Sequence, residues 1–321
     1  MSLVTIRHAS GYAMIDPYVA RVWQRSLMPR GALLLLLALV ACGGPATHQR
    51  MNRERRSGSS GTPFGADRDF EPTAFEVEVT GLGRPIIFIP GLGCPGEVWA
   101  ETVGHLGDNY QAHVLTLAGF AGVPRIDEPL SAAVRRDLTR YIRAKRLDHP
   151  IIVGHSMGGF IAYWIASYHP DLVGPVIIVD ASPALSGGLD EAKELRTKWK
   201  DADDAQYFAQ VRAAFNSMTR MSKRMAPVVD KIVRSDRRSI GDAIYEMVIT
   251  DLRDHVAEIQ APVLVIAADG PLQKRIREQI EPIPDHEMVV IPNTHHFVMW
   301  DAPAAFFKVV DRFLADHPPN T

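Results

Sequence analysis

Five residues near the middle of the chain, Gly154 to Gly158, have the pattern Gly-His-Ser-Met-Gly. An apolar run that ends at Val153 precedes them, and an apolar helical pattern from Phe160 to Tyr168 follows. Where a strand turns sharply into a helix, the central serine of this pattern is exposed above the sheet, beside the first N–H groups of the helix. The flanking glycines permit that turn because they have no Cβ to clash with the backbone. This context predicts that Ser156 is a nucleophile, rather than part of an ordinary strand-to-helix turn.

A serine nucleophile needs a base, a group that orients the base, and N–H donors for the oxyanion. The candidate bases are His295 and His296, which stand together near the end of the chain. A metal site at this pair is the weaker interpretation, because no carboxylate or cysteine stands at ligand spacing. His155, which precedes the serine, is expected to point away from the hydroxyl and to be a packing residue.

Short apolar runs separated by helical patterns predict the elements that position these residues. The predicted strands are 75–79, 85–89, 112–117, 151–153, 176–179, 263–267 and 288–291, and helical patterns cover 98–106, 130–145, 160–168, 272–280 and 304–314. Continuous apolar strands such as 85–89 are typical of a parallel sheet that is covered on both faces. The alternation predicts an α/β fold with a doubly wound, mostly parallel sheet.

The alternation of strands and helices is interrupted between Ser182 and about Val256. This segment has no strand-like run, and helical patterns cover 189–200, 205–221, 228–234 and 240–250. It is long enough to form a helical cap over the carboxyl edge of the sheet, where open α/β sheets bind their ligands. Four of its methionines could line an adaptable apolar pocket or belong to the core of the cap, namely Met218, Met221, Met225 and Met247.

The chain resembles the α/β-hydrolase superfamily from about Phe75 to Leu314, and within it the capped serine hydrolases. The motifs that carry the resemblance are Pro90-Gly91-Leu92-Gly93, Gly154-His155-Ser156-Met157-Gly158-Gly159 and His295-His296-Phe297, in the order expected for this fold. In the strand order of this superfamily, the cap is inserted after the sixth strand.

The resemblance implies roles for three further residues. The superfamily places its base directly before an aromatic or apolar residue, which implies His296 rather than His295 as the base. It also implies that the N–H groups of Leu92 and Met157 form the oxyanion hole. Proline stands here at position 90, where the superfamily usually has histidine, but the donor is a backbone N–H and need not be affected.

Two aspartates remain as candidates for the acid that orients the histidine. Asp180 follows the strand that precedes the cap, where a minority of the superfamily keeps its acid. Asp269 follows the next strand, about two residues earlier than the usual position of the superfamily's acid. The sequence slightly favours Asp180 and leaves Asp269 open.

The first sixty residues are not expected to belong to the fold. Arg25 and Arg30 precede an apolar stretch, 32–42, that is shorter than the roughly 18–20 residues needed to span a bilayer. This is the layout of a secretory signal. Leu39-Val40-Ala41-Cys42 resembles the lipobox of bacterial lipoproteins, which implies cleavage before Cys42 and lipidation of its thiol. A plain signal peptide or a short hydrophobic anchor is the alternative.

The predicted organisation therefore has four parts. Residues 1–41 are a lipoprotein-type signal peptide, 42–72 a flexible tether, 73–181 and 257–321 the hydrolase core, and 182–256 the helical cap. The tether is predicted because this stretch is rich in Gly, Ser, Pro, Thr and Arg and cannot bury enough apolar surface to order itself. The expected location is the cell envelope, with a lipid anchor in the membrane, facing the periplasm if the cell is Gram-negative.

Composition limits the remaining classes of function. The chain has 321 residues, 46% of them hydrophobic, a formal net charge of −2 and two cysteines. No basic stripe is visible, so nucleic acid is not an expected partner, and two cysteines build neither a disulfide framework nor a four-cysteine metal site. No cofactor is expected.

The expected activity is hydrolysis of an ester or related acyl bond of a small, apolar substrate through a Ser-His-Asp triad. The same residues could serve a carbon–carbon bond hydrolase or a cofactor-free haloperoxidase. A non-enzymatic binding module would be expected to lack a member of the triad.

Overall fold

A computed structural model describes residues 70–185, 188–198 and 202–319 of the chain. The predicted signal peptide, the lipidation site at Cys42 and all but residues 70–72 of the predicted tether lie outside these residues. Within the described ranges, no helix is both long enough and apolar enough to cross a membrane.

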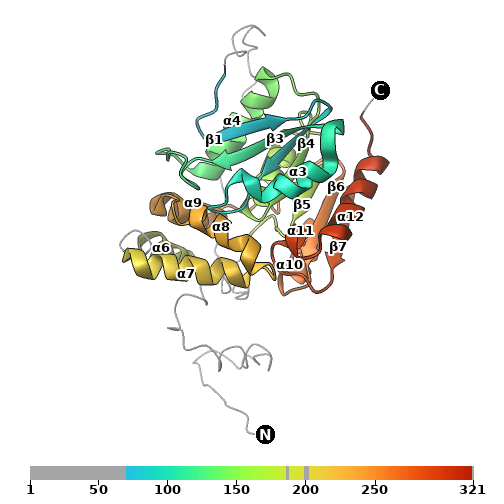
Figure 1. Cartoon of the computed structure of the whole chain (residues 1–321). Coiled ribbons are helices and arrows are strands. Elements are labelled where there is room, and N and C mark those ends of the chain that lie inside the picture. The colour runs from blue at the N-terminus through green and yellow to red at the C-terminus, as the bar shows by residue number, and fades with distance from the viewer. Residues whose placement is uncertain (1–69, 186–187, 199–201, 320–321) are drawn as a thin grey trace.

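In the described part of the chain, seven strands form one sheet in the order β1-β3-β2-β4-β5-β6-β7 (Figure 1). The edge strand β1 runs antiparallel to β3, and every other neighbouring pair is parallel. The α/β fold with a mostly parallel sheet, as predicted from the sequence, is confirmed. The strands are β1 (Phe75–Thr80), β2 (Arg84–Ile89), β3 (Tyr110–Leu117), β4 (Ile151–His155), β5 (Val176–Val179), β6 (Val263–Ala268) and β7 (His286–Ile291).

Helices cover both faces of the sheet and bury its strands. Alternate residues of β2 show this, because Ile87 and Ile89 pack in the core under α4, α5 and α10, whereas Ile86 and Phe88 pack in the core under α3 and α12. All four side chains are fully buried. Burial on both faces explains why the strands are continuous apolar runs. The helices are α3 (Ala100–Leu106), α4 (Leu130–Ala144), α5 (Met157–Tyr168), α10 (Leu272–Ile280), α11 (Val298–Asp301) and α12 (Pro303–Asp316).

Four α-helices of the described chain lie between β5 and β6, and they gather at one end of the sheet (Figure 1). They are α6 (Leu189–Lys198), α7 (Asp204–Ser217), α8 (Ser222–Ile232) and α9 (Arg237–Ile249). We refer to α6–α9 and their connections as the cap. Within the described residues, the cap follows β5, the fifth strand of the sheet in chain order.

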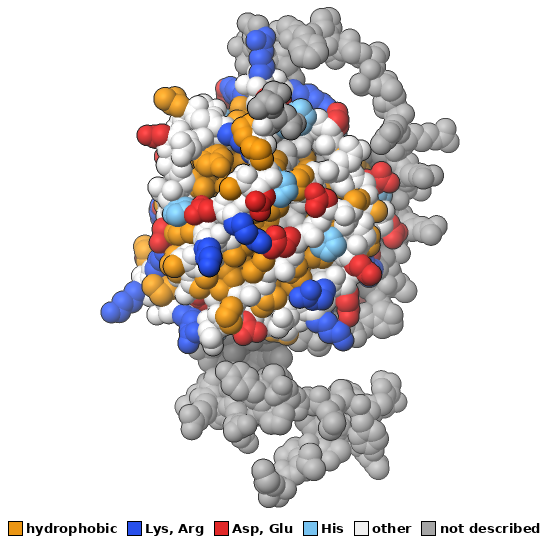
Figure 2. Space-filling view, turned by 90° about the vertical axis from the view of Figure 1, so that its right-hand side faces the viewer, with side chains coloured by type: hydrophobic (Ala, Val, Ile, Leu, Met, Phe, Trp, Pro, Cys, Tyr) orange, Lys and Arg blue, Asp and Glu red, His pale blue; other side chains and the backbone are white. Residues whose placement is uncertain are grey.

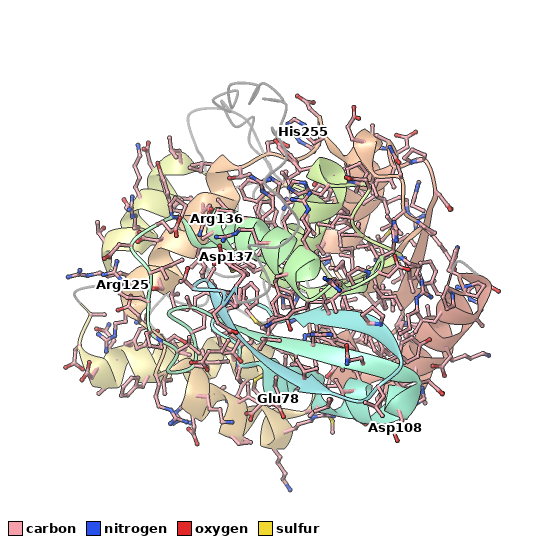
Figure 3. All side chains as sticks on the ribbon, turned by 90° about the horizontal axis from the view of Figure 1, so that it is seen from above. Glu78, Asp108, Arg125, Arg136, Asp137 and His255 are labelled. Atoms are coloured by element: carbon pink, nitrogen blue, oxygen red, sulfur yellow. The ribbon has the colours of Figure 1, made fainter. Side chains whose placement is uncertain are left out.

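The first described residues are tied to the core by Asp137. This buried side chain lies on α4 beside Arg136 (Figure 3) and accepts hydrogen bonds from the N–H groups of Thr73 at 2.9 Å and Ala74 at 3.1 Å. Arg136 donates to the other carboxylate oxygen at 3.0 Å. The chain therefore enters β1 from a fixed point.

One face of the molecule mixes apolar and charged side chains. On the side of α12 and β7, acidic and basic groups alternate among apolar ones (Figure 2). Arg312 of α12 and Glu287 of β7, for example, form an ion pair at the surface. Surface pairs of this kind contribute little to stability, about 0–1 kcal/mol each, so the fold depends on its buried contacts.

A buried carboxylate joins the cap to the core. Glu246 of α9 is 6% exposed and accepts hydrogen bonds from the N–H groups of Ser131 at 2.7 Å and Ala132 at 3.0 Å. These groups belong to the first turn of α4, where backbone donors have no partner within the helix. Burial raises the pKa of Glu246, and the two backbone donors oppose that shift.

Glu246→Ala is expected to lower the free energy of unfolding by about 2–4 kcal/mol, because it leaves one buried and one half-buried N–H group of α4 unpaired. Urea unfolding followed by circular dichroism measures this loss. Glu258→Ala, at an exposed glutamate, is the control and should stay within about 0.5 kcal/mol of wild type. Equal stability of the two variants would show that Glu246 does not join the cap to α4.

Candidate active site

Ser156 lies at the sharp turn from β4 into α5. Its backbone has φ 54° and ψ −119°, a left-handed conformation that residues with a Cβ rarely adopt. Hydrogen bonds hold it there, because its N–H donates to the carbonyl of Val179 and its carbonyl accepts from Phe160, both at 3.0 Å. The strained turn places the serine on the wall of a cavity.

The glycines on either side of Ser156 allow close packing of backbone. A Cβ on Gly154 would lie 2.3 Å from the carbonyl oxygen of Gly158, and one on Gly158 would lie 2.2 Å from that of Ile89. Neither position tolerates a side chain. The Gly-x-Ser-x-Gly pattern thus follows from the packing of α5 against β2 and β4.

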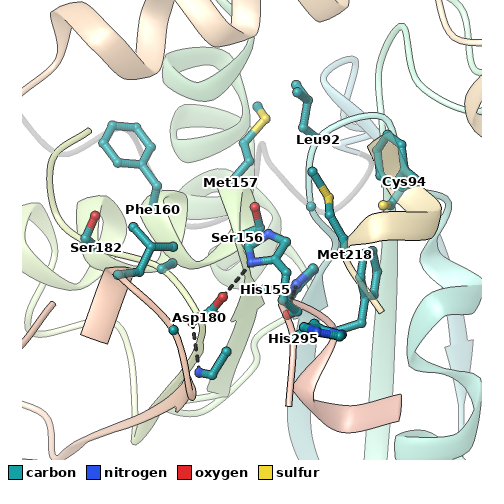
Figure 4. Close-up of a pocket in the computed structure, with 18 of the residues that line it drawn as sticks. Leu92, Cys94, His155, Ser156, Met157, Phe160, Asp180, Ser182, Met218 and His295 are labelled. Carbon is teal, nitrogen blue, oxygen red and sulfur yellow. Dashed lines mark hydrogen bonds and ion pairs between the residues drawn. The ribbon is translucent and has the colours of Figure 1, made fainter. Parts of the chain in front are cut away.

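Asp180 and His296 form a hydrogen bond at the carboxyl edge of the sheet. Nδ1 of His296 lies 2.6 Å from one carboxylate oxygen of Asp180. Asp180 is labelled in Figure 4, where dashed lines mark its hydrogen bonds. Because a carboxylate only accepts, Nδ1 carries the proton, which leaves Nε2 as the acceptor in the neutral ring. The second oxygen of Asp180 accepts from the N–H of Ala268 at 3.0 Å. Asp180 is only 3% exposed. The two hydrogen bonds, one to each oxygen, fix its carboxylate.

Asp269 lines the same cavity but is placed differently. Its side chain is exposed, and it accepts from the N–H of Asn293 at 3.4 Å. Among the described residues, no hydrogen bond or ion pair joins it to His296. Of the two candidate acids, the fold therefore brings Asp180 to the histidine.

His155 supports the loop that carries His296. It is buried, its ring centroid is 4.6 Å from that of His296, and its Nε2 donates to the carbonyl oxygen of His296 at 3.0 Å. Burial, and then the neighbouring His296, hold the pKa of His155 well below its usual value, although the hydrogen bond to the carbonyl opposes this shift. His155 is thus a neutral residue that does more than the packing expected from the sequence, since it fixes the backbone of His296.

The side chain of the other histidine, His295, is half exposed and does not take part in the contact with Asp180. Its backbone N–H donates to Asp301 at 2.8 Å. The described part of the chain contains no group of three or more His, Cys, Asp or Glu side chains that could hold a metal ion. Asp301 was not identified in the sequence, where it is one of many acidic residues near a helix start.

The residues expected to bind the oxyanion lie beside the serine. Leu92 and Met157 both line the cavity, and Met157 is the first residue of α5, where backbone N–H groups have no partner within the helix. The neighbouring Gly91 lies against the serine, because a Cβ there would be 3.2 Å from the Cβ of Ser156.

The cavity has a volume of about 300 Å³ and lies between the sheet edge and the cap. This is the lower end of the range for small-molecule sites. Its cap-side wall is largely apolar, formed by Leu185, Ala214, Phe215, Met218, Ile244 and Met247. Two of the four methionines considered in the sequence thus line it. Met225 is instead buried in the cap and Met221 is exposed.

Cys94 also lines the cavity, but it is not a nucleophile of the kind that Ser156 is expected to be. Burial raises the pKa of its thiol to about 12. The thiolate is the reactive form of cysteine, so Cys94 is inert near neutral pH.

Comparison with known proteins agrees with the fold. Residues 86–309 match the model of the alpha/beta hydrolase family. N-formylmaleamate deformylase from Pseudomonas putida is 26% identical over 254 residues, which cover 74% of this chain and 91% of that protein. Pimeloyl-[acyl-carrier protein] methyl ester esterase from Vibrio vulnificus is 20% identical over 250 residues, or 71% of this chain and 93% of that protein.

Among solved structures, the enol-lactonase from Burkholderia xenovorans superposes with a TM-score of 0.68 at 19% identity, covering 75% of this chain and 96% of that one. At this identity the likeness shows the fold alone. The family match extends over most of the chain and includes the elbow at Ser156 and the loop of His296. The chain belongs to the alpha/beta hydrolase family and is a hydrolase.

Proposed function

We propose that this protein hydrolyses carboxylic esters of small, apolar acids, with Ser156 as nucleophile, His296 as base and Asp180 as the residue that orients the base. The observation that carries the proposal is the 2.6 Å hydrogen bond between His296 and Asp180 on the same cavity wall as the strained Ser156. A histidine without a catalytic role would not need a buried carboxylate hydrogen-bonded to its Nδ1. A base for serine needs this arrangement, because it leaves Nε2 unprotonated.

In this mechanism, the hydroxyl oxygen of Ser156 attacks the ester carbonyl carbon while Nε2 of His296 takes the hydroxyl proton. The charge on the carbonyl oxygen is stabilised by the N–H groups of Leu92 and Met157. As the tetrahedral intermediate collapses, His296 gives the proton to the departing alkoxide, and an alcohol and an acyl-enzyme result. Water then attacks the acyl-enzyme, with His296 again as base, and the acid is released.

The size and lining of the cavity support a small, apolar acyl group. The cap supplies leucine, phenylalanine, isoleucine and methionine side chains, and burial of a CH₂ group among them is worth about 0.8 kcal/mol. Two of the similar proteins are named as a deformylase and a methyl ester esterase, which supports hydrolysis of an acyl bond.

A p-nitrophenyl ester series of increasing acyl length tests the activity. Turnover should rise with chain length and fall once the acyl group exceeds the cavity. Ser156→Ala should lower turnover by a factor on the order of 10⁶ and abolish labelling by a fluorophosphonate probe, because the nucleophile is lost. The fold of the variant is checked by circular dichroism. A tenth of the wild-type activity in the alanine variant would exclude Ser156 as nucleophile.

The two aspartates should differ sharply in kcat. Asp180→Asn is expected to lower it by roughly 10⁴, as in the serine-protease case, because an asparagine lets the histidine adopt the wrong tautomer. Asp269→Asn, at the exposed aspartate of the same cavity, is the matched control and should lose less than about tenfold. Steady-state kinetics at matched folded fraction measures both. Equal, mild losses would mean that another residue orients His296.

We also propose that the protein is exported and anchored in the cell envelope by a lipid on Cys42. The support is the sequence alone, an apolar stretch that ends in Leu39-Val40-Ala41-Cys42 after two arginines. A lipid on the cysteine would keep the hydrolase domain at a membrane surface.

Cys42→Ser should move the protein from the membrane to the soluble fraction, because the thiol that would carry the lipid is removed. Membrane fractionation and mass spectrometry of the mature N-terminus provide the measurement. In wild type, globomycin should cause the precursor to accumulate. A soluble wild-type protein whose mature chain starts elsewhere than Cys42 would contradict lipidation.

A further inference from the structure

The loop that carries His296 is bound to the cap as well as to the sheet. The turn between α7 and α8, residues 218–221, lies against it. The N–H of Phe297 donates to the carbonyl of Met218 at 3.1 Å. Arg220 donates from Nη1 to the carbonyl of Asn293 at 2.8 Å. Two residues of the cap turn, Met218 and Arg220, therefore contact the histidine loop on either side of His296.

Asp301 is the centre of this contact. Its side chain, at the end of α11, is fully buried. One carboxylate oxygen accepts from the hydroxyl of Thr219 at 2.6 Å and from the N–H of Arg220 at 2.8 Å. The other accepts from the N–H of His295 at 2.8 Å. A single carboxylate thus joins the cap turn to the residue directly before His296.

The contacts of the histidine loop complement one another. Asp180 holds the ring of His296, His155 holds its carbonyl oxygen, and Asp301 holds the peptide N–H one residue earlier. The ring position depends on the backbone from which it projects. Displacement of a catalytic group by about 1 Å can cost a factor of about 10² in rate.

The geometry points to Asp301 as a positioning residue for His296, one that makes the α7–α8 turn of the cap part of the catalytic scaffold. The rate of the chemical step then depends on a contact between cap and histidine loop, in which Thr219 contributes the hydroxyl from the cap side. This inference rests on the proposed function, because it takes His296 as the base. Asp301 itself touches neither the substrate nor the reacting atoms.

A merely structural role for Asp301 makes different predictions. If the carboxylate only stabilises the fold, its loss lowers the melting temperature but leaves the turnover of the folded enzyme unchanged. If it positions His296, its loss lowers kcat of the folded enzyme. KM should change little, because the apolar side chains of the cavity bind the substrate and Asp301 is not one of them. The two roles are therefore separated by kinetics well below the melting temperature.

The experiment compares Asp301→Asn and Thr219→Val with Asp311→Asn, an aspartate of α12 that pairs with His105 at the surface. Asp301→Asn is expected to lower kcat by about ten- to a hundredfold, with KM within about threefold of wild type. Thr219→Val should lower kcat in the same direction by about three- to tenfold, and Thr219→Ser, which keeps the donor, should restore most of that loss. Asp311→Asn should match wild type.

The double variant tests whether the two residues act through one contact. Thr219→Val combined with Asp301→Asn should lose little more than Asp301→Asn alone. An asparagine has one acceptor oxygen, so it cannot accept from the cap turn and from the N–H of His295 at the same time, and the connection between them is already broken. Independent, multiplying losses would overturn the connection through Thr219. Wild-type kcat in folded Asp301→Asn would overturn the positioning role.

A second measurement does not depend on ester turnover. The proton in the 2.6 Å hydrogen bond between His296 and Asp180 should give an NMR resonance far downfield of the amide region. Asp301→Asn and Thr219→Val should shift or broaden it, whereas Asp311→Asn should not. An unmoved resonance in both variants contradicts the inference. If wild type hydrolyses no ester but the resonance moves as expected, the proposed function fails and the positioning of His296 by Asp301 stands.

Discussion

The hydrogen bond between His296 and Asp180 requires that the fold bring the end of β5 and the loop after β7 to the same place. It joins side chains 116 positions apart in the sequence, from the end of β5 and from the loop after β7. Strand β6 lies between them, and its last residue, Ala268, donates to the second oxygen of Asp180. Parallel pairing of β5, β6 and β7 brings these three ends to one edge of the sheet. The carboxylate and the imidazole meet because the strand order is fixed.

Two residues at this edge of the sheet have strained backbone conformations that the sheet maintains. Ser156 and Asp180 both have positive φ, at 54° and 47°, and each such residue costs on the order of 1–3 kcal/mol. Backbone hydrogen bonds to neighbouring strands hold both, since Ser156 donates to Val179 and Asp180 donates to Ile266. Rigid parallel strands, buried on both faces, therefore maintain two unfavourable conformations at the point where the chemistry is proposed to occur.

Two buried carboxylates join the cap to the core at separate places. Glu246 accepts from the first turn of α4, and Asp301 accepts from the turn between α7 and α8 and from the histidine loop. The N–H of Ser131 is buried, and leaving it without a partner would cost about 1–3 kcal/mol. Asp301 is itself the buried group, and the hydroxyl of Thr219 and the N–H of His295 satisfy its two oxygens. These two contacts hold the cap over the cavity, which its apolar side chains line together with Ser156.

Local pattern determined the class of fold and the position of the serine. Strands buried on both faces must be apolar throughout, and the packing of Gly154 and Gly158 against backbone excludes any side chain, so both features are visible in the sequence. The helices of the cap were also predicted, although α8 begins at Ser222, six residues before the predicted start, and contains Pro227. The preference for His296 over His295 came from resemblance to a family.

Other features depend on contacts between segments far apart in the chain. Asp180 and Asp269 both follow apolar strands, and only the tertiary structure shows that the first meets His296 while the second lies exposed on the same cavity and accepts from Asn293. Neither hydrophobic periodicity nor motif spacing predicts two further contacts. These are the contact of His155 with the carbonyl of His296 and that of Asp301 with the cap turn. Hydrogen bonds of this kind are set by the relative placement of loops, which the sheet order and the packing of the cap decide together.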